Sequence, residues 1–334
     1  MIFFIIIGTI SIIGNLFVLI VIFKSKNLRH SQYVYNCSIA ISDVIWGLTV
    51  NMYYVCQVLN FLSSKLICSQ EVFSDTVSNV TRNKDNITKY VLELEKVNLS
   101  QDIFNFFENF KFKQTFFIIV LLVTPITLLI SFITLVVAAI DRYIALTFPF
   151  KYKQINTVKR SIIVSLFVWV LTSVFYICST YESGHPSLFF QPFVAYNHFN
   201  KNGLNQSFTV AVLFSLFVML WTLTVMTVFS LRKSYKRSLA LNRITKKGYA
   251  LEKKLSLVFI FMVLSFTFSL TPTIYNHIYY YALENSGYVP YEDKQFFLCI
   301  LFLSTNSTWN FLIYNILNKN FRNALKTCVG LKNS

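Results

Sequence analysis

The sequence predicts an all-α fold, a bundle of seven membrane-spanning helices, and three observations support this class. Of the 334 residues, 55% are hydrophobic and only 13% are charged, whereas soluble domains carry about 25% charged residues. Seven runs with few or no charges are each long enough to cross a bilayer. Gly (8) and Pro (6) are scarce beside 35 Phe, which favours long helices over a membrane barrel of short alternating strands.

The predicted spans follow one another in a single domain, 1–334. They cover residues 1–23, 34–64, 114–140, 161–181, 202–231, 255–283 and 295–318. The uncharged third run is typical, because 27 helical residues extend about 40 Å and a hydrocarbon core is about 30 Å thick. Asp43 is the one acidic or basic residue inside the seven runs.

Two further segments complete the predicted organisation. The polar stretch 65–113 is predicted to be a long loop. The basic stretch 319–331 places Phe321, Leu325 and Cys328 on one helical face, which predicts a short amphipathic helix on the inner leaflet. The first span begins without a preceding tail. Either it serves as its own signal anchor, or the chain lacks its natural start.

The charges of the connections predict the orientation. The connections after the first, third and fifth spans, together with the tail, hold 21 Lys and Arg and two acids, whereas the other connections hold 9 Lys and Arg and 11 acids. The basic side is expected to be cytoplasmic, so the N-terminus lies outside. This distribution also argues that the net charge of +16 reflects membrane topology and contact with lipid, not nucleic-acid binding.

Four glycosylation sequons agree with this orientation, because they fall on the predicted outer side. The expected sites are Asn79, Asn86, Asn98 and Asn205. A further sequon, at Asn306, lies inside the last span and is expected to be unmodified.

Several short motifs occur in a fixed order along the spans. They are Gly14-Asn15 in the first, Asp43 in the second, Asp141-Arg142-Tyr143 at the end of the third, Trp169 in the fourth, Pro272 in the sixth, and Asn310 with Tyr314 in the seventh. With the N-terminus outside, this pattern resembles the rhodopsin-like (class A) G-protein-coupled receptors over nearly the whole chain except 65–113. The resemblance implies a plasma-membrane receptor that passes an extracellular signal to a heterotrimeric G protein.

The resemblance implies that the Asp141-Arg142-Tyr143 motif takes part in an ion pair between two helices that opens on activation. This ion pair is called the latch. In this family the Arg pairs with an acid twenty residues before the proline of the sixth span, and counting back from Pro272 gives Glu252. Arg142 and Glu252 would be paired in the inactive receptor and separated in the active one. Alternatively, the charge pair merely marks the end of the helix. Pro149 and Phe150 resemble the contact made to the Gα subunit, although Phe150 could equally be an interfacial anchor.

Asp43 is the second candidate site, because a carboxylate deep in a membrane span is costly and usually functional. The family pattern places four polar residues around it, namely Ser131, Asn306, Ser307 and Asn310. Oxygen ligands with one carboxylate suit a hard cation, and the resemblance implies a sodium ion. The alternatives are a protonation-linked site and a hydrated polar network that holds the helices together.

Activation in this family involves an outward swing of the sixth span, which Pro272 is expected to kink. The aromatic residue usual two positions before this proline is Leu270 here, so ligand coupling is expected through Phe266 or Phe268. In the seventh span, Phe311 replaces the usual proline, while Asn310 and Tyr314 are kept. Asn15 belongs to the same set of activation residues.

The cysteines predict no metal site, because no metal-ligand spacing is present. The family disulfide from the outer end of the third span is also absent. A different bridge could form among four cysteines that are predicted to lie near the outer face, namely Cys56, Cys68, Cys178 and Cys299. Cys328 in the amphipathic helix is a candidate for palmitoylation or a plain buried thiol.

The ligand is expected to be a peptide or a small neutral molecule. Thr124 and Ser304 occupy the positions where amine receptors carry Asp and light receptors carry Lys, so an amine or retinal is not expected. Tyr275 and His277 are further pocket candidates. The rival functions are a degenerate, non-signalling or decoy receptor of the same fold and, with less support, a transporter or channel. The usual catalytic motifs are missing, so an enzyme is not expected.

Overall fold

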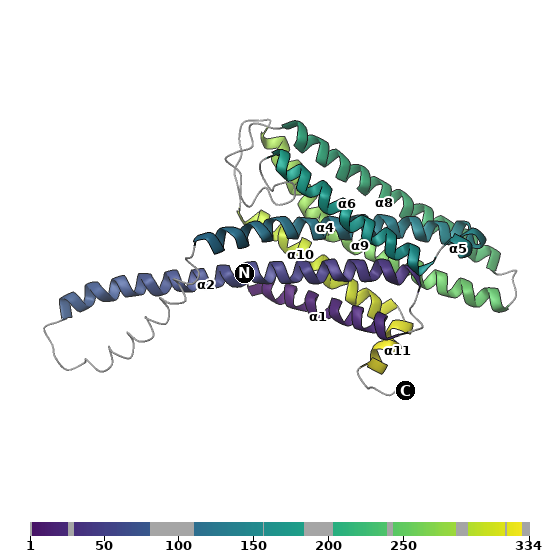
Figure 1. Ribbon diagram of the computed structural model, residues 1–334, viewed down its shortest axis with the longest axis horizontal. Helices are drawn as coiled ribbons and strands as arrows, with labels where there is room; N and C mark the ends of the chain where they lie inside the picture. The colour runs from purple at the N-terminus through teal and green to yellow at the C-terminus, as the bar shows by residue number, and fades with distance from the viewer. Residues whose placement is uncertain are drawn as a thin grey trace.

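The chain folds into a bundle of long helices (Figure 1). The computed structural model describes residues 2–25, 30–80, 110–155, 157–183, 203–238, 243–284, 293–317 and 319–328. In order, the helices are α1 (Ile2–Lys24), α2 (Ser31–Val80), α4 (Phe110–Thr147), α5 (Pro149–Ile155), α6 (Val158–Ser183), α8 (Gly203–Ser238), α9 (Arg243–Glu284), α10 (Asp293–Leu317) and α11 (Lys319–Cys328).

The predicted spans correspond to the long helices of the bundle. Within the described residues, five segments are long and apolar enough to cross a membrane, namely Ile2–Lys24, Val123–Thr147, Val158–Cys178, Phe214–Ser234 and Lys253–Tyr275. The other two predicted spans, 34–64 and 295–318, fall on α2 and α10. The all-α fold class is therefore confirmed.

The predicted loop 65–113 is wrong at both of its ends. Helix α2 continues to Val80, and α4 begins at Phe110. The prediction placed the loop where the sequence turns polar, but polarity ends a membrane span without ending a helix. No Gly or Pro occurs between residues 65 and 80 to stop α2. In Figure 1 the far end of α2 extends well beyond the other helices.

A short helix, α5, follows α4 after the single residue Phe148, although the sequence suggested only a loop here. Backbone hydrogen bonds continue through the junction, with the amide of Phe148 2.9 Å from the carbonyl of Ile144 and the amide of Tyr152 2.9 Å from the carbonyl of Phe148. Pro149 opens α5 at the position where a missing N–H costs least. The direction of α5 is therefore tied closely to that of α4.

Helix α4 is the centre of the bundle and packs against α2, α6, α8 and α9. The helices α1 and α2 approach especially closely. A Cβ atom added at Gly47 would lie 2.8 Å from Cγ1 of Ile12 and 2.9 Å from the carbonyl oxygen of Gly8. Small residues permit such close packing of membrane helices, and this contact fixes the position of Asp43, one turn away on α2.

The predicted amphipathic helix is present as α11, at the same end of the bundle as α5 (Figure 1). Phe321 is fully buried, with its ring 5.7 Å from that of Tyr314. The Nη1 group of Arg322 donates to the carbonyls of Asn315 and Ile316 at 2.9 and 2.5 Å. These bonds cap the end of α10, whose last carbonyls lack helical partners.

Candidate functional site

The motif at the end of α4 forms a buried ion pair. Arg142 is 1% exposed, and its Nη2 and Nε atoms donate to Oδ2 of Asp141 at 2.6 and 3.2 Å. A guanidinium group that is removed from water requires such a partner, because an unpaired buried charge is strongly destabilising. The adjacent acid therefore allows the charge of Arg142 to lie inside the bundle.

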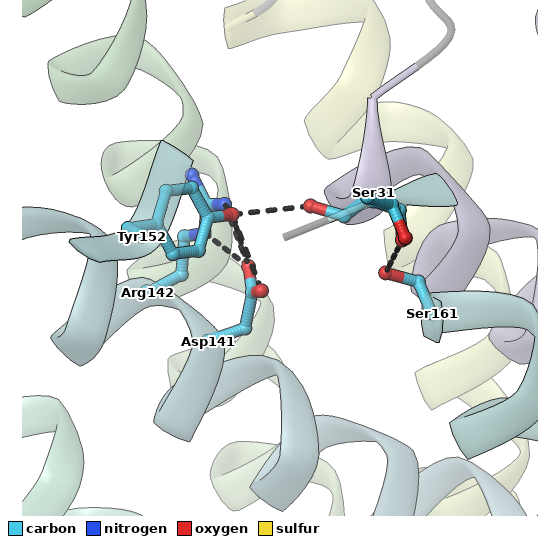
Figure 2. Close-up of polar contacts among 6 residues, drawn as sticks. Ser31, Asp141, Arg142, Tyr152 and Ser161 are labelled. Atoms are coloured by element: carbon cyan, nitrogen blue, oxygen red, sulfur yellow. Dashed lines mark hydrogen bonds and ion pairs between the residues drawn. The ribbon is translucent and has the colours of Figure 1, made fainter. Parts of the chain in front are cut away.

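Tyr152 of α5 completes this cluster, and the sequence analysis missed it. Its hydroxyl accepts a hydrogen bond from Nη2 of Arg142 at 2.8 Å and donates to Oδ2 of Asp141 at 3.0 Å. The same oxygen lies 3.1 Å from Oγ of Ser31, at the start of α2. Figure 2 shows these side chains converging from three helices, with Ser161 of α6 beside them. A tyrosine ten residues after the motif, in a segment predicted as a loop, gives little signal in a single sequence.

The other residues predicted to take part in coupling lie around this cluster. Tyr143 is half-buried. Pro149 opens α5, and the side chain of Phe150 is 84% exposed. Glu252 belongs to α9, but its side chain lies outside the described residues.

A second polar cluster surrounds Asp43 in the middle of the bundle. The Nδ2 atom of Asn310 donates to Oδ2 of Asp43 at 2.6 Å, and the hydroxyls of Ser307 and Ser131 also interact with this carboxyl group. Ser131 lies 2.6 Å from the hydroxyl of Ser42. The predicted residues are thus brought together from α2, α4 and α10. Asn306 is buried on the same helix as Asn310.

Asn15 links this cluster to α1. Its Nδ2 atom donates to the carbonyls of Ser11 and Ser307, each at 2.9 Å. The hydroxyl of Ser11 in turn donates to the carbonyl of Asp43 at 3.3 Å. The polar contacts therefore run from α1 through α2 to α10, as expected of residues that hold the helices in a defined arrangement.

The two aromatic candidates near Pro272 differ in their surroundings. Phe266 is buried and stacks on Phe132 of α4, with ring centroids 5.2 Å apart. Phe268 is 59% exposed and contacts Phe302 edge to face. Only Phe266 thus faces the interior, where Leu270 is also buried.

The segment of α9 that precedes Pro272 contacts α10 through Tyr314. This tyrosine is buried, and its hydroxyl lies 3.3 Å from the sulfur of Met262. The contact joins the seventh predicted span to the segment of α9 on the predicted cytoplasmic side of Pro272.

The candidate ligand residues do not share one environment. Thr124 is buried and donates to the hydroxyl of Thr49 at 3.4 Å, and Ser304 is also buried. Tyr275 is 67% exposed on the outside of the bundle. The side chain of His277 lies outside the described residues.

The cysteines and sequons are only partly described. Cys178 and Cys299 are free thiols, so neither takes part in the suggested bridge, and Cys328 is free and half-buried. The side chains of Cys56 and Cys68 are outside the described part. Asn79 and Asn205 lie near the end of α2 and the start of α8, again without described side chains, and Asn86 and Asn98 fall outside the described residues.

Comparison with known proteins matches the helical bundle to one family. The family described as 7 transmembrane receptor (rhodopsin family) matches residues 95–314, about two thirds of the chain. Melanocortin receptor 3 of Rattus norvegicus is 22% identical over 171 residues, which covers 51% of this chain and 40% of that receptor. The chain thus spans less than half the length of this relative.

Proposed function

The chain belongs to the rhodopsin family of seven-transmembrane receptors, and from this premise we propose that it carries an extracellular signal to a heterotrimeric G protein. As a member of this family it is a multi-pass membrane receptor and not an enzyme. We place it in the plasma membrane, where an extracellular ligand can reach its outer face. The ligand we propose is a peptide or a small neutral molecule.

The observation that carries this proposal is the buried guanidinium of Arg142. It is paired with Asp141 at the inner end of α4. It also lies within residues 95–314, the part of the chain that matches the receptor family. A cation held in this way can change partners when neighbouring helices move, and such exchange of ion pairs is a common basis of switching. Arg142 is thus poised to meet the G protein once it is released.

Glu252 is proposed as the acid that closes the latch. Position 252 lies one helical turn before Ser256 of α9, and Ser256 is fully buried. Residues four apart share a helical face, and this spacing supports the choice of Glu252 as the acid of the latch. Pairing between Arg142 and Glu252 would hold the inner ends of α4 and α9 together.

The moving element is proposed to be the inner half of α9. Pro272 lies inside this helix, and a proline removes one helical hydrogen bond and permits a bend. Phe266 stacks on α4 six residues before the proline and is the proposed aromatic coupling residue. An outward swing of α9 would break the contact between Tyr314 and Met262 and open the inner face to the G protein, with Phe150 as a contact.

The residues around Asp43 fit a sodium ion. The hydroxyls of Ser131 and Ser307 contact the carboxylate, and Asn310 donates to it from Nδ2. With the Asn310 amide turned and Asn306 added, these side chains would supply a set of oxygen ligands with one negative charge. Such a set matches the preference of a hard cation. We propose that these residues bind sodium and that the ion favours the inactive packing, because it joins α2, α4 and α10.

The test is basal G-protein signalling in cells, which requires no known ligand. The wild type is compared with Glu252→Ala and Arg142→Ala at matched surface expression. We expect Glu252→Ala to raise basal signalling about five- to tenfold, at the lower end of the effects that typical coupling free energies produce, because it opens the latch. We expect Arg142→Ala to abolish it, because the G protein loses its contact.

Lys253→Ala is a control that neutralises an adjacent charge on the same helix without removing the acid. If neither principal variant changes any G-protein output while all reach the surface, the signalling proposal fails. The chain would then be a non-signalling or decoy receptor, an outcome for which Leu270 and Phe311 at two family motif positions already provide a reason.

A further inference from the structure

The indole of Trp221 forms a hydrogen bond between two helices. Its Nε1–H group donates to the hydroxyl oxygen of Thr267 at 3.2 Å and so joins α8 to α9. The Thr267 hydroxyl donates its own proton to the carbonyl of Val263 at 2.8 Å, which leaves a lone pair available for the indole. The directions of the two bonds are therefore consistent, because an indole can only donate.

Trp221 differs in this respect from the polar side chains beside it on α8. Thr224 and Thr227 are buried, but their hydroxyls donate to the carbonyls of Leu220 and Leu223 in the same helix, each at 2.7 Å. These bonds do not connect α8 to another helix. Trp221 is half-buried and follows the fully buried Leu220, about 100° further around the helix. From this position its indole reaches α9.

The position of Thr267 relative to Pro272 determines which movement the bond resists. Thr267 lies five residues before the proline, and Lys253, nearer the inner end of α9, lies nineteen residues before it. At 1.5 Å per residue these separations are about 7.5 and 28 Å, so a bend at Pro272 displaces Thr267 by about a quarter of the displacement of Lys253. A hydrogen bond is lost when its atoms separate by a few tenths of an ångström. A large swing of α9 therefore breaks the bond unless α8 follows.

Helix α8 is itself restrained. It packs against the central helix α4, and the hydroxyls of Ser230 and Thr147 lie 3.2 Å apart where α4 ends. Separation of Trp221 from Thr267 would also leave the indole N–H group facing lipid, which offers no acceptor. The bond therefore favours the closed packing, in which the inner half of α9 lies against α8.

We propose that Trp221 is a positioning residue that holds the inner half of α9 against α8 and so stabilises the closed packing. It acts separately from the proposed Arg142–Glu252 latch, which joins α4 to α9. The signalling consequence rests on the proposed function. The tie between α8 and α9 does not, and the two are measured separately.

The tie is measured by NMR of the indole N–H groups in the purified full-length receptor. The chain has four tryptophans, and the Trp221 signal is the one that Trp221→Phe removes. Thr267→Val keeps the branched shape of the side chain and removes the acceptor, so it should shift the Trp221 signal. Thr267→Ser keeps the hydroxyl and should leave the signal near its wild-type position.

Thr271→Val is the matched control. It removes the same hydroxyl from the same helix, but the Thr271 hydroxyl donates to the carbonyl of Thr267 within α9 at 2.7 Å. The Trp221 signal should therefore stay in place.

The signalling consequence is measured as basal nucleotide exchange on a reconstituted heterotrimeric G protein. We expect Thr267→Val and Trp221→Phe each to raise it about threefold, the usual effect of one interhelical hydrogen bond in a membrane. The double variant should exceed neither single variant, because both substitutions remove the same bond. Thr267→Ser and Thr271→Val should match the wild type.

The outcomes separate the two claims. An unshifted Trp221 signal in Thr267→Val overturns the tie. A shifted signal with unchanged or reduced basal exchange, or with additive effects in the double variant, overturns the restraint on α9 in a receptor that responds to Glu252→Ala.

Two further results keep the test decisive. If Trp221→Phe does not fold, the signal that shifts in Thr267→Val and not in Thr267→Ser identifies Trp221, and basal exchange in these two variants decides the restraint. If Arg142→Ala and Glu252→Ala leave every G-protein output unchanged, the proposed function fails, while the indole signal still decides whether α8 is tied to α9.

Discussion

Two buried charged residues dominate the chemistry of this receptor, and they are stabilised in different ways. Arg142 is neutralised by the adjacent Asp141. Asp43 is surrounded by an amide and hydroxyl groups, and its described contacts include no cationic side chain. A charge that is solvated only by neutral dipoles inside a membrane has a strong tendency to bind a counter-ion. This difference makes Asp43, and not the ion pair, the residue expected to respond to salt.

We predict that Asp43→Asn abolishes sodium-dependent stabilisation of the purified receptor. Thermal unfolding would be compared in sodium chloride and in choline chloride at equal ionic strength. Sodium at ten times its dissociation constant should stabilise the wild type by about 1.4 kcal/mol. The Asn variant should unfold at the same temperature in both salts.

Ser38→Ala is the control for this measurement. Ser38 is a buried serine of α2 that bonds to Trp169 and lies near Thr134, away from the carboxyl group of Asp43. An equal response of the wild type and Asp43→Asn to sodium would contradict the proposed site.

The helices themselves were predictable to the extent that hydrophobicity determines them. Long uncharged runs indicated each membrane helix, because an unsatisfied backbone is costly in lipid. Hydrophobicity did not reveal where α2 ends, because its last turns are polar, nor the presence of α5, because seven residues carry no clear periodicity. The position of Tyr152 depends on α5 and was lost with it. Asp43 and Asn310 could be paired only through family resemblance, because they are 267 residues apart.

The contact between α1 and α2 leads to a second prediction. Gly47→Ala should destabilise the receptor by about 1–3 kcal/mol, the usual cost of overpacking, because its new methyl group would meet Ile12 and the backbone of Gly8. Thermal unfolding in detergent measures the effect. The neighbouring Leu48 is exposed on the outside of the bundle, so Leu48→Ala should be nearly neutral there. Equal stability of Gly47→Ala and the wild type would contradict this prediction, because it would show that α1 and α2 can move apart without a loss of unfolding free energy.

At the scale of the whole molecule, the charged residues divide the receptor into two sides. The connections predicted to be cytoplasmic carry most of the Lys and Arg, and the four sequons expected to be glycosylated lie on the other side. The helices α5 and α11 lie at the same end of the bundle (Figure 1), as the predicted orientation requires.

Glycosylation tests this orientation. We predict that enzymatic removal of N-linked sugars increases the electrophoretic mobility of the receptor expressed in animal cells. Gln substitutions at Asn79, Asn86, Asn98 and Asn205 should each reduce that shift, because these sites face the lumen during synthesis. Asn306→Gln should leave it unchanged, since Asn306 is buried in α10. A shift that depends on Asn306 would contradict the assigned topology.

The different surroundings of the two buried charges also have an electrical consequence. Because Asp141 and Arg142 cancel, a transmembrane voltage exerts almost no net force on their pair. With the proposed ionised form, Asp43 would carry an unbalanced charge within the membrane, and a charge that crosses the full membrane gains about 2.3 kcal/mol per 100 mV. Any cation that enters or leaves the site beside Asp43 therefore moves through part of this field. With sodium at the proposed site, the resting potential of the cell would act directly on the balance between the two proposed packings of the bundle.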